Sequence, residues 1–132
     1  MRILGLDIGD RKTGIAIADM SASVAIPREV IRDAGRDETI ARIVEIIRDE
    51  NIDLIVAGVP YNLKGEVAHQ AEKVLKFIKH LKKAIAIPVE TIDERLTSKA
   101  FKGLENDDSM AAAMILQTWL DIRIKNTGED EE

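Results

Sequence analysis

Apolar and polar positions in the first part of the chain follow the pattern of β-strands joined by short turns. The first apolar segment is nearly continuous and is followed by the turn from Gly9 to Lys12, with Gly14 near the start of the second segment. The third contains Pro27, which places it at a sheet edge or at a bulge. The predicted strands cover residues 2–8, 13–18 and 24–31. Their short connections predict antiparallel hairpins.

The pattern then changes to helical periods separated by single strands. Residues 37–50 place Ile40, Ile43, Val44 and Ile47 on one helical face. Residues 53–59 form an apolar strand, 66–83 an amphipathic helix, 85–92 a strand and 108–124 a final helix. This order predicts an α/β fold with a mixed five-stranded sheet, three antiparallel strands followed by parallel ones, flanked by helices on both faces.

The length of 132 residues and the ordinary globular composition predict one domain, which we place at residues 1–125. Residues 126–132 form an acidic segment that we expect to be a disordered tail. The net charge is −5, but the last four residues carry four of those charges, which leaves −1 for the rest. A nucleic-acid partner is therefore not excluded by charge.

The chain has no cysteine, which excludes disulfides, thiolate zinc sites and cysteine nucleophiles. No apolar run is long enough for a membrane span, so we expect a cytoplasmic protein that does not bind a membrane. Aromatic residues make up 3% of the chain, which argues against recognition of bases by an exposed aromatic platform.

Three acidic positions occur where this fold would bring side chains together. Asp7 ends the first strand, Asp93 and Glu94 follow the fifth, and Asp108 opens the last helix. The carboxyl ends of parallel strands form the usual ligand-binding edge of an α/β sheet. Each position also has a structural explanation, because aspartates form turns and the sequence Asp108-Ser109 suits a helix N-cap. Asp7 is distinguished by its apolar surroundings, since a buried carboxylate needs a partner.

Three converging carboxylates repel one another unless a cation neutralises them. Carboxylate oxygens favour Mg²⁺ or Mn²⁺, and two such ions can hydrolyse a phosphodiester. We therefore expect Asp7, Glu94 and Asp108 to be both the metal ligands and the catalytic residues.

Basic residues supply candidate contacts to a phosphate backbone. Lys12 lies in the first turn, and Asn62 and Lys64 lie in the loop that precedes the second helix. That loop and helix carry six lysines against two glutamates: Lys64, Lys73, Lys76, Lys79, Lys82, Lys83, Glu66 and Glu72. A solvated helix face is the commoner explanation of such a run, but this is also the best candidate for the charge pattern expected of nucleic-acid binding.

Four motifs resemble those of the YqgF/RuvX family, RNase H-like proteins described as pre-16S rRNA nucleases or Holliday junction resolvases. They are GLDIGDRKTGIAIAD at residues 5–19, GVPYNLKG at 58–65, DERLTS at 93–98 and DSMAAAMILQTWLD at 108–121. The resemblance spans most of the chain. It implies an RNase H-like fold, Asp7, Glu94 and Asp108 as metal ligands, and Arg95, Thr97 and Asn62 as supporting or substrate-contacting residues.

One segment departs from the family pattern. Family members have a longer segment, often rich in Lys and Arg, between the last two motifs, where this chain has only KAFKGLEND at residues 99–107. If the longer segment contributes to substrate binding in the family, this chain binds its substrate differently or more weakly. The shortening also makes Asp107 an alternative to Asp108 as the third ligand.

The leading hypothesis is a metal-dependent nuclease acting on structured nucleic acid, with 5′-end processing of pre-16S rRNA as the expected role. A Holliday junction resolvase is the alternative enzyme and would require a homodimer, because two strands must be cut. A non-catalytic nucleic-acid-binding module in ribosome assembly is the third hypothesis. An actin-like ATPase also begins with a strand aspartate and a glycine hairpin, but it needs a second domain, so we expect no useful ATP affinity.

Overall fold

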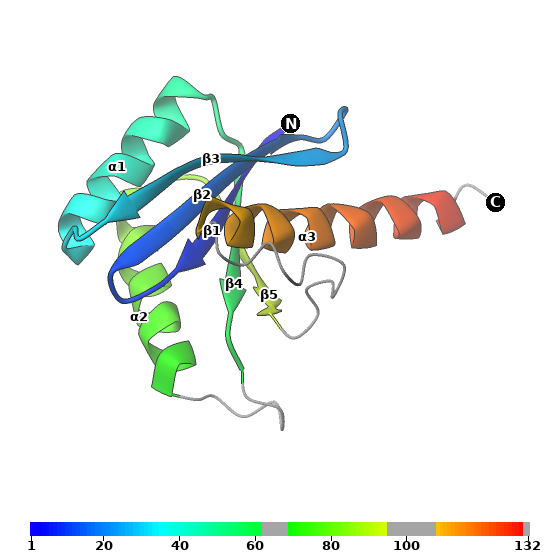
Figure 1. Cartoon of the computed structure of the whole chain (residues 1–132). Coiled ribbons are helices and arrows are strands. Elements are labelled where there is room, and N and C mark those ends of the chain that lie inside the picture. Colours follow the sequence, from blue (N-terminus) through cyan, green and yellow to red (C-terminus); the bar gives the residue numbers. More distant parts are fainter. Residues whose placement is uncertain (62–68, 95–107, 131–132) are drawn as a thin grey trace.

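The computed structural model describes residues 1–61, 69–94 and 108–130, with side chains of the last segment described for residues 110–124. The elements in chain order are β1 (Arg2–Ile8), β2 (Lys12–Asp19), β3 (Val24–Arg32), α1 (Arg36–Asp49), β4 (Leu54–Val59), α2 (His69–Ala84), β5 (Val89–Asp93) and α3 (Asp108–Asp130) (Figure 1). The element order agrees with the predicted order. No helix in these ranges has both the length and the apolar character required to cross a membrane.

The strands form one mixed sheet in the order β3-β2-β1-β4-β5. β2 pairs antiparallel with both β1 and β3, whereas β4 pairs parallel with both β1 and β5. The predicted mixed five-stranded sheet is therefore confirmed. The carboxyl ends of β1, β4 and β5 lie at the same edge of the sheet, as parallel pairing requires.

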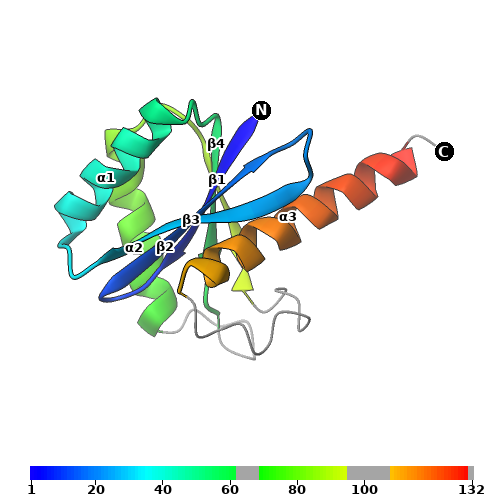
Figure 2. The same ribbon diagram turned by 45° about the horizontal axis from the view of Figure 1, so that its top comes forward.

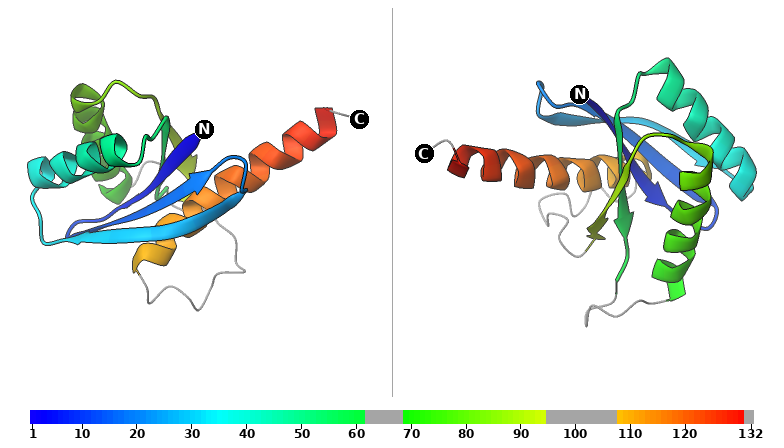
Figure 3. Two further views of the ribbon diagram at one scale, coloured as in Figure 1. Left: turned by 90° about the horizontal axis from the view of Figure 1, so that it is seen from above. Right: turned by 180° about the vertical axis from the view of Figure 1, so that it is seen from behind.

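Helices cover both faces of the sheet. α1 and α2 lie on one face and α3 crosses the other, as the views in Figures 2 and 3 show. The core on the α1–α2 face includes Leu4, Leu6, Ile15, Ile43, Ile55, Val74, Ile78 and Leu81. The core on the α3 face includes Ile3, Ala16, Val56, Ile92, Ala112, Ile115, Leu116 and Trp119. Because successive strand residues point to opposite faces, neighbours along β1 contribute to different cores.

Two strands show where local chemistry interrupts the ladder. β3 is an edge strand, and its register with β2 shifts at Ile15 and Ala16, which pair with Glu29 and Pro27. The expectation that Pro27 marks an edge or a bulge is confirmed in both respects. β5 begins at Val89 rather than at residue 85. Pro88 precedes it and has no N–H to donate to the ladder.

The ends of the helices also differ from the predicted bounds. The predicted start of the second helix, residue 66, lies outside the described residues. α3 continues to Asp130 and so includes five of the seven residues expected to form the acidic tail. The amide of Gln117 links the middle of α3 to the β2–β3 turn and the start of β3: its Oε1 accepts from Ala25 N at 2.9 Å and its Nε2 donates to Ser23 O at 3.1 Å.

Gly5 in the middle of β1 allows α3 to approach the sheet closely. A Cβ atom placed on Gly5 would lie 2.8 Å from Cβ of Leu116 and 3.1 Å from the carbonyl oxygen of Ala112. The atoms in the way belong to the helix backbone and to a Cβ, so they cannot move without shifting α3. The close packing of α3 on the sheet therefore explains why residue 5 is glycine.

We expect Gly5→Ala to lower the free energy of unfolding by about 1–3 kcal/mol, the usual cost of overpacking a core. Urea denaturation followed by circular dichroism measures it. Gly35→Ala is the matched control, because no atom lies within 4 Å of a Cβ placed there, and we expect its effect to stay within about 0.5 kcal/mol. Equal stability of wild type and Gly5→Ala would show that α3 is not held this closely.

Candidate active site

Asp7 lies near the carboxyl end of β1, where the strand leaves the centre of the sheet. It pairs with Gly14 of β2, which has no side chain to compete for the space beside it. Alternation along β1 places Asp7 on the same face as Ile3 and Gly5, the face covered by α3. Asp7 is half-buried there.

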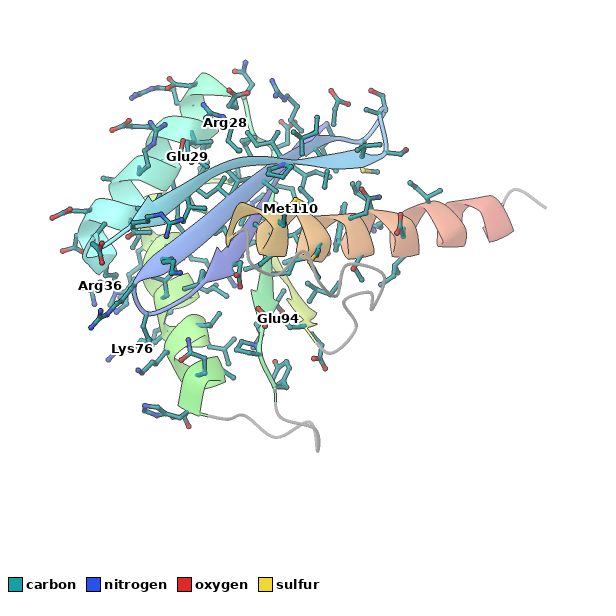
Figure 4. All side chains as sticks on the ribbon, in the orientation of Figure 1. Arg28, Glu29, Arg36, Lys76, Glu94 and Met110 are labelled. Carbon is teal, nitrogen blue, oxygen red and sulfur yellow. The ribbon has the colours of Figure 1, made fainter. Side chains whose placement is uncertain are left out.

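Glu94 immediately follows β5 and lies over β4. A Cβ atom placed on Gly58 of β4 would lie 2.9 Å from both Cγ and Oε1 of Glu94, and 2.6 Å from Cδ1 of Ile115 on α3. The side chain of Glu94 therefore occupies space that exists because residue 58 is glycine. Figure 4 shows Glu94 at this end of β4 and β5.

The carboxyl groups of Asp7 and Glu94 are close enough to share a hydrogen bond. Burial is the largest effect that raises the pKa of Glu94, to about 7, and the negative charge of Asp7, its hydrogen bond and the charge of Asp93 add to it. Without a cation, Glu94 therefore retains its proton at a pH where an exposed glutamate has lost it. Two strands that are distant in sequence thus bring together two of the three predicted acidic residues.

This raised pKa predicts that metal-free protein becomes less stable as pH rises. The native state binds the Glu94 proton more tightly than the unfolded state, in which the pKa is near 4.5. Stability is therefore lost between about pH 4.5 and pH 7, by roughly 1–2 kcal/mol once solvent access to the group is considered. Urea denaturation in EDTA at pH 5 and pH 8 measures the loss. In Glu94→Gln it should be absent, and an identical pH trend in both proteins would contradict the assignment.

The third predicted ligand, Asp108, is the first residue of α3, one helical turn before Ala112, whose backbone oxygen lies against β1. Its side chain is outside the described residues, as are the predicted substrate-contacting residues Asn62, Lys64, Arg95 and Thr97 and the alternative ligand Asp107. Lys12 begins β2 and borders a pocket between the β1–β2 turn and α2.

Within the described ranges, no group of three His, Cys, Asp or Glu side chains is arranged to hold a metal ion. The described contribution is the pair Asp7 and Glu94. The chemistry of this pair suits a divalent cation. The two half-buried carboxyl groups share a hydrogen bond, and a bound cation can take the place of the proton between them.

Sequence reasoning missed Gly58 as a residue of the site. The signal was present, because this glycine interrupts the strand LIVAGV, in which every residue is buried. A glycine within a buried strand often marks a close approach by another group. The partner could not be identified from sequence, since Glu94 arrives from a strand 36 positions further along.

Comparison with known proteins supports the resemblance seen in the motifs. Residues 1–122 match the family model described as "RuvX: Holliday junction resolvase". A protein of Thermoanaerobacter pseudethanolicus, named "Putative pre-16S rRNA nuclease", is 37% identical over 92% of this chain and 96% of its own length. One from Desulforamulus reducens with the same name is 39% identical over 92% and 97%, respectively.

Solved structures agree with the fold. RuvC of Thermus thermophilus in complex with a Holliday junction substrate superposes with a TM-score of 0.67 and 14% identity, covering 95% of this chain and 96% of that one. The fowlpox virus Holliday junction resolvase gives a TM-score of 0.55 and 14% identity, covering 92% and 98%. At this identity the likeness concerns the fold, which is the RNase H-like fold of RuvC. The sequence matches go further, and the chain belongs to the RuvX/YqgF family.

Proposed function

We propose that this protein is a metal-dependent nuclease that hydrolyses phosphodiester bonds in structured nucleic acid. The observation that carries the proposal is the hydrogen-bonded pair of Asp7 and Glu94 at the carboxyl edge of the sheet, with the pKa of Glu94 raised to about 7. Strongly perturbed carboxyl groups at a sheet edge are typical of catalytic sites. Here the perturbation comes from burial and from the neighbouring acid, and a cation removes the second cause.

The residues expected to hold the metal are Asp7, Glu94 and Asp108. Oxygen donors of this kind suit Mg²⁺ or Mn²⁺. When bound, a pair of such ions activates water and stabilises the leaving oxygen of a phosphodiester. Asp108 would complete the set from the first turn of α3, whose position relative to β1 is fixed by the close contact at Gly5.

The contribution of the chain itself is to place the carboxylates and to tune their charge. Asp7 is held by a central strand that pairs on both sides, and Glu94 lies against Gly58. Glu94 gives up its proton when a cation binds, so metal affinity should increase with pH up to about 7. Neither carboxylate needs to form a covalent intermediate, and we assign attack to water.

For the substrate we propose the 5′ end of pre-16S rRNA. Support comes from the shared name of the curated relatives, which align with nearly their whole length. Lys12, Lys64 and Arg95, with Asn62 and Thr97, are the proposed contacts to the backbone. Contacts of basic side chains to phosphates would make binding weaken as salt rises.

The test compares two substrates under the same conditions. Purified protein is incubated in Mn²⁺ or Mg²⁺, and separately in EDTA, with a 16S rRNA precursor carrying its 5′ leader and with a four-way DNA junction. We expect metal-dependent cleavage within the leader. Cleavage of the junction alone would support the resolvase instead, and binding of either substrate without cleavage in any metal would contradict catalysis.

A further inference from the structure

A pocket of about 300 Å³ lies on the face of the sheet opposite to the candidate active site. Its walls come from the β1–β2 turn, the end of β3, the start of α1 and the part of α2 from Gln70 to His80. Ile8, Val74 and Phe77 form an apolar floor. A space of this size accommodates roughly one nucleotide and excludes a duplex.

The pocket is rich in positive charge. Five basic residues line it against one acidic residue among the described residues: Arg11, Lys12, Arg36, Lys73, Lys76 and Asp10. Asp10 is already engaged, because its Oδ1 lies 3.3 Å from Nζ of Lys73. Arg11 and Lys76 are exposed at the opening, and Figure 4 shows Arg36 and Lys76 on the side of the molecule away from Glu94.

The surroundings of His80 show the excess of positive charge in the pocket. Its Nε2 accepts a hydrogen bond from Nη1 of Arg36 at 3.2 Å. Desolvation, followed by the charges of Arg36, Lys83 and Lys76, lowers the pKa of His80, and Asp37 opposes them only weakly. The basic side chains of α1 and α2 around His80 therefore outnumber the acidic ones, and this excess of positive charge favours the binding of an anion.

The pocket and Asp7 lie on opposite faces of β1. Asp7 faces α3, and the next residue, Ile8, lines the pocket on the other face. The β1–β2 turn, residues 9–11, is the edge of the sheet that separates them. A single strand bound at Asp7 therefore reaches the pocket by crossing this turn.

We propose that this pocket binds one nucleotide of a single-stranded segment of the nucleic-acid substrate, with its phosphate among Arg11, Arg36 and Lys76 and its sugar or base on the apolar floor. The proposal rests on the proposed function in that the partner is nucleic acid. It adds a contact on the opposite face of the sheet, which would help a chain that lacks the family's longer basic segment before α3 to bind its substrate.

The test uses the full chain in EDTA, so that binding is measured without cleavage. A single-stranded RNA octamer is titrated while the His80 ring resonance is followed by NMR, and its Kd is measured by fluorescence anisotropy. We expect a saturable shift of His80. Arg11→Glu and Lys76→Glu should each weaken binding at least about tenfold, because hydrogen bonds to charged groups are strong. In each variant, the slope of log Kd against the logarithm of the salt concentration should be smaller than in wild type by about one.

Arg48→Glu is the matched control, since it makes the same charge change as Arg11→Glu at an exposed position near the end of α1, outside the pocket lining. We expect it to change Kd by less than about threefold. A His80 resonance that does not shift, or an equal loss of binding in Arg48→Glu and Arg11→Glu, would overturn the proposal. So would an equal His80 shift with adenosine monophosphate at the concentration of RNA that saturates it, which would indicate a free-nucleotide site.

Failure here is separable from failure of the proposed function. If the octamer shifts the His80 resonance but the protein cleaves no substrate, the nuclease proposal is contradicted and the proposed nucleotide site is supported. Protein that cleaves normally in metal while His80 remains unmoved contradicts the pocket alone.

Discussion

Asp7→Asn and Glu94→Gln should each reduce metal-dependent cleavage by about a hundredfold to a thousandfold, because metal ligation contributes several kcal/mol to the transition state. Each change replaces a carboxylate with a neutral group of the same shape, so the loss reports charge rather than packing. Initial rates on the 5′-extended rRNA at saturating Mn²⁺ measure the effect. Both variants should be at least as stable as wild type at pH 8 in EDTA, since the repulsion within the pair is removed.

Asp19→Asn is the matched control for these variants. Asp19 is exposed at the opposite end of the sheet, and its Oδ1 accepts hydrogen bonds from Ser21, from the backbone amide at 3.0 Å and from the hydroxyl at 2.8 Å. We expect its cleavage rate to stay within about twofold of wild type, as for surface substitutions away from a site. Wild-type cleavage by Asp7→Asn would remove the carboxylate pair from the mechanism.

Gly58→Ala should lower cleavage by about tenfold to a hundredfold, the usual effect of disturbing the groups that orient metal ligands. The added methyl would meet Oε1 of Glu94 at 2.9 Å and Cδ1 of Ile115 at 2.6 Å. Both atoms end flexible side chains, so the fold can adapt by moving them, but Glu94 then leaves its position beside Asp7. Cleavage rate and Mn²⁺ affinity should therefore fall together while the free energy of unfolding changes little.

The double variant Gly58→Ala/Ile115→Val separates the two clashes. Valine lacks the Cδ1 atom that the new methyl would meet, so packing against α3 is relieved, but the clash with Glu94 remains. We expect the double variant to regain any lost stability without regaining activity. Full recovery of cleavage would show that Ile115, rather than Glu94, responds to the substitution.

The fold could be predicted largely because its signals are local. The nearly continuous apolar runs of β1 and β4 and the helical face of α1 each follow from nearby residues. The prediction failed for residues 85–88, where apolar side chains suggested a strand. Ile85 and Ile87 instead pack against the core on the α1–α2 face before the ladder of β5 begins.

The site could be predicted only in part. Topology alone placed Asp7 and Glu94 at one edge, because parallel strands end together. The space at Gly58 and the raised pKa of Glu94 depend on how β4, β5 and α3 pack, which no local pattern records. The basic pocket also required the structure, since Arg11 lies in the β1–β2 turn, Arg36 in α1 and Lys76 in α2.

The most direct test of the central claim is a crystal structure with Mn²⁺ bound at pH 8, with the metal located by its anomalous scattering. We predict anomalous density within about 2.1 Å of a carboxylate oxygen of both Asp7 and Glu94, with Asp108 as the third ligand. At saturating Mn²⁺, a carboxylate pair that remained hydrogen-bonded with no density between its members would contradict the claim that this is a metal-dependent nuclease site.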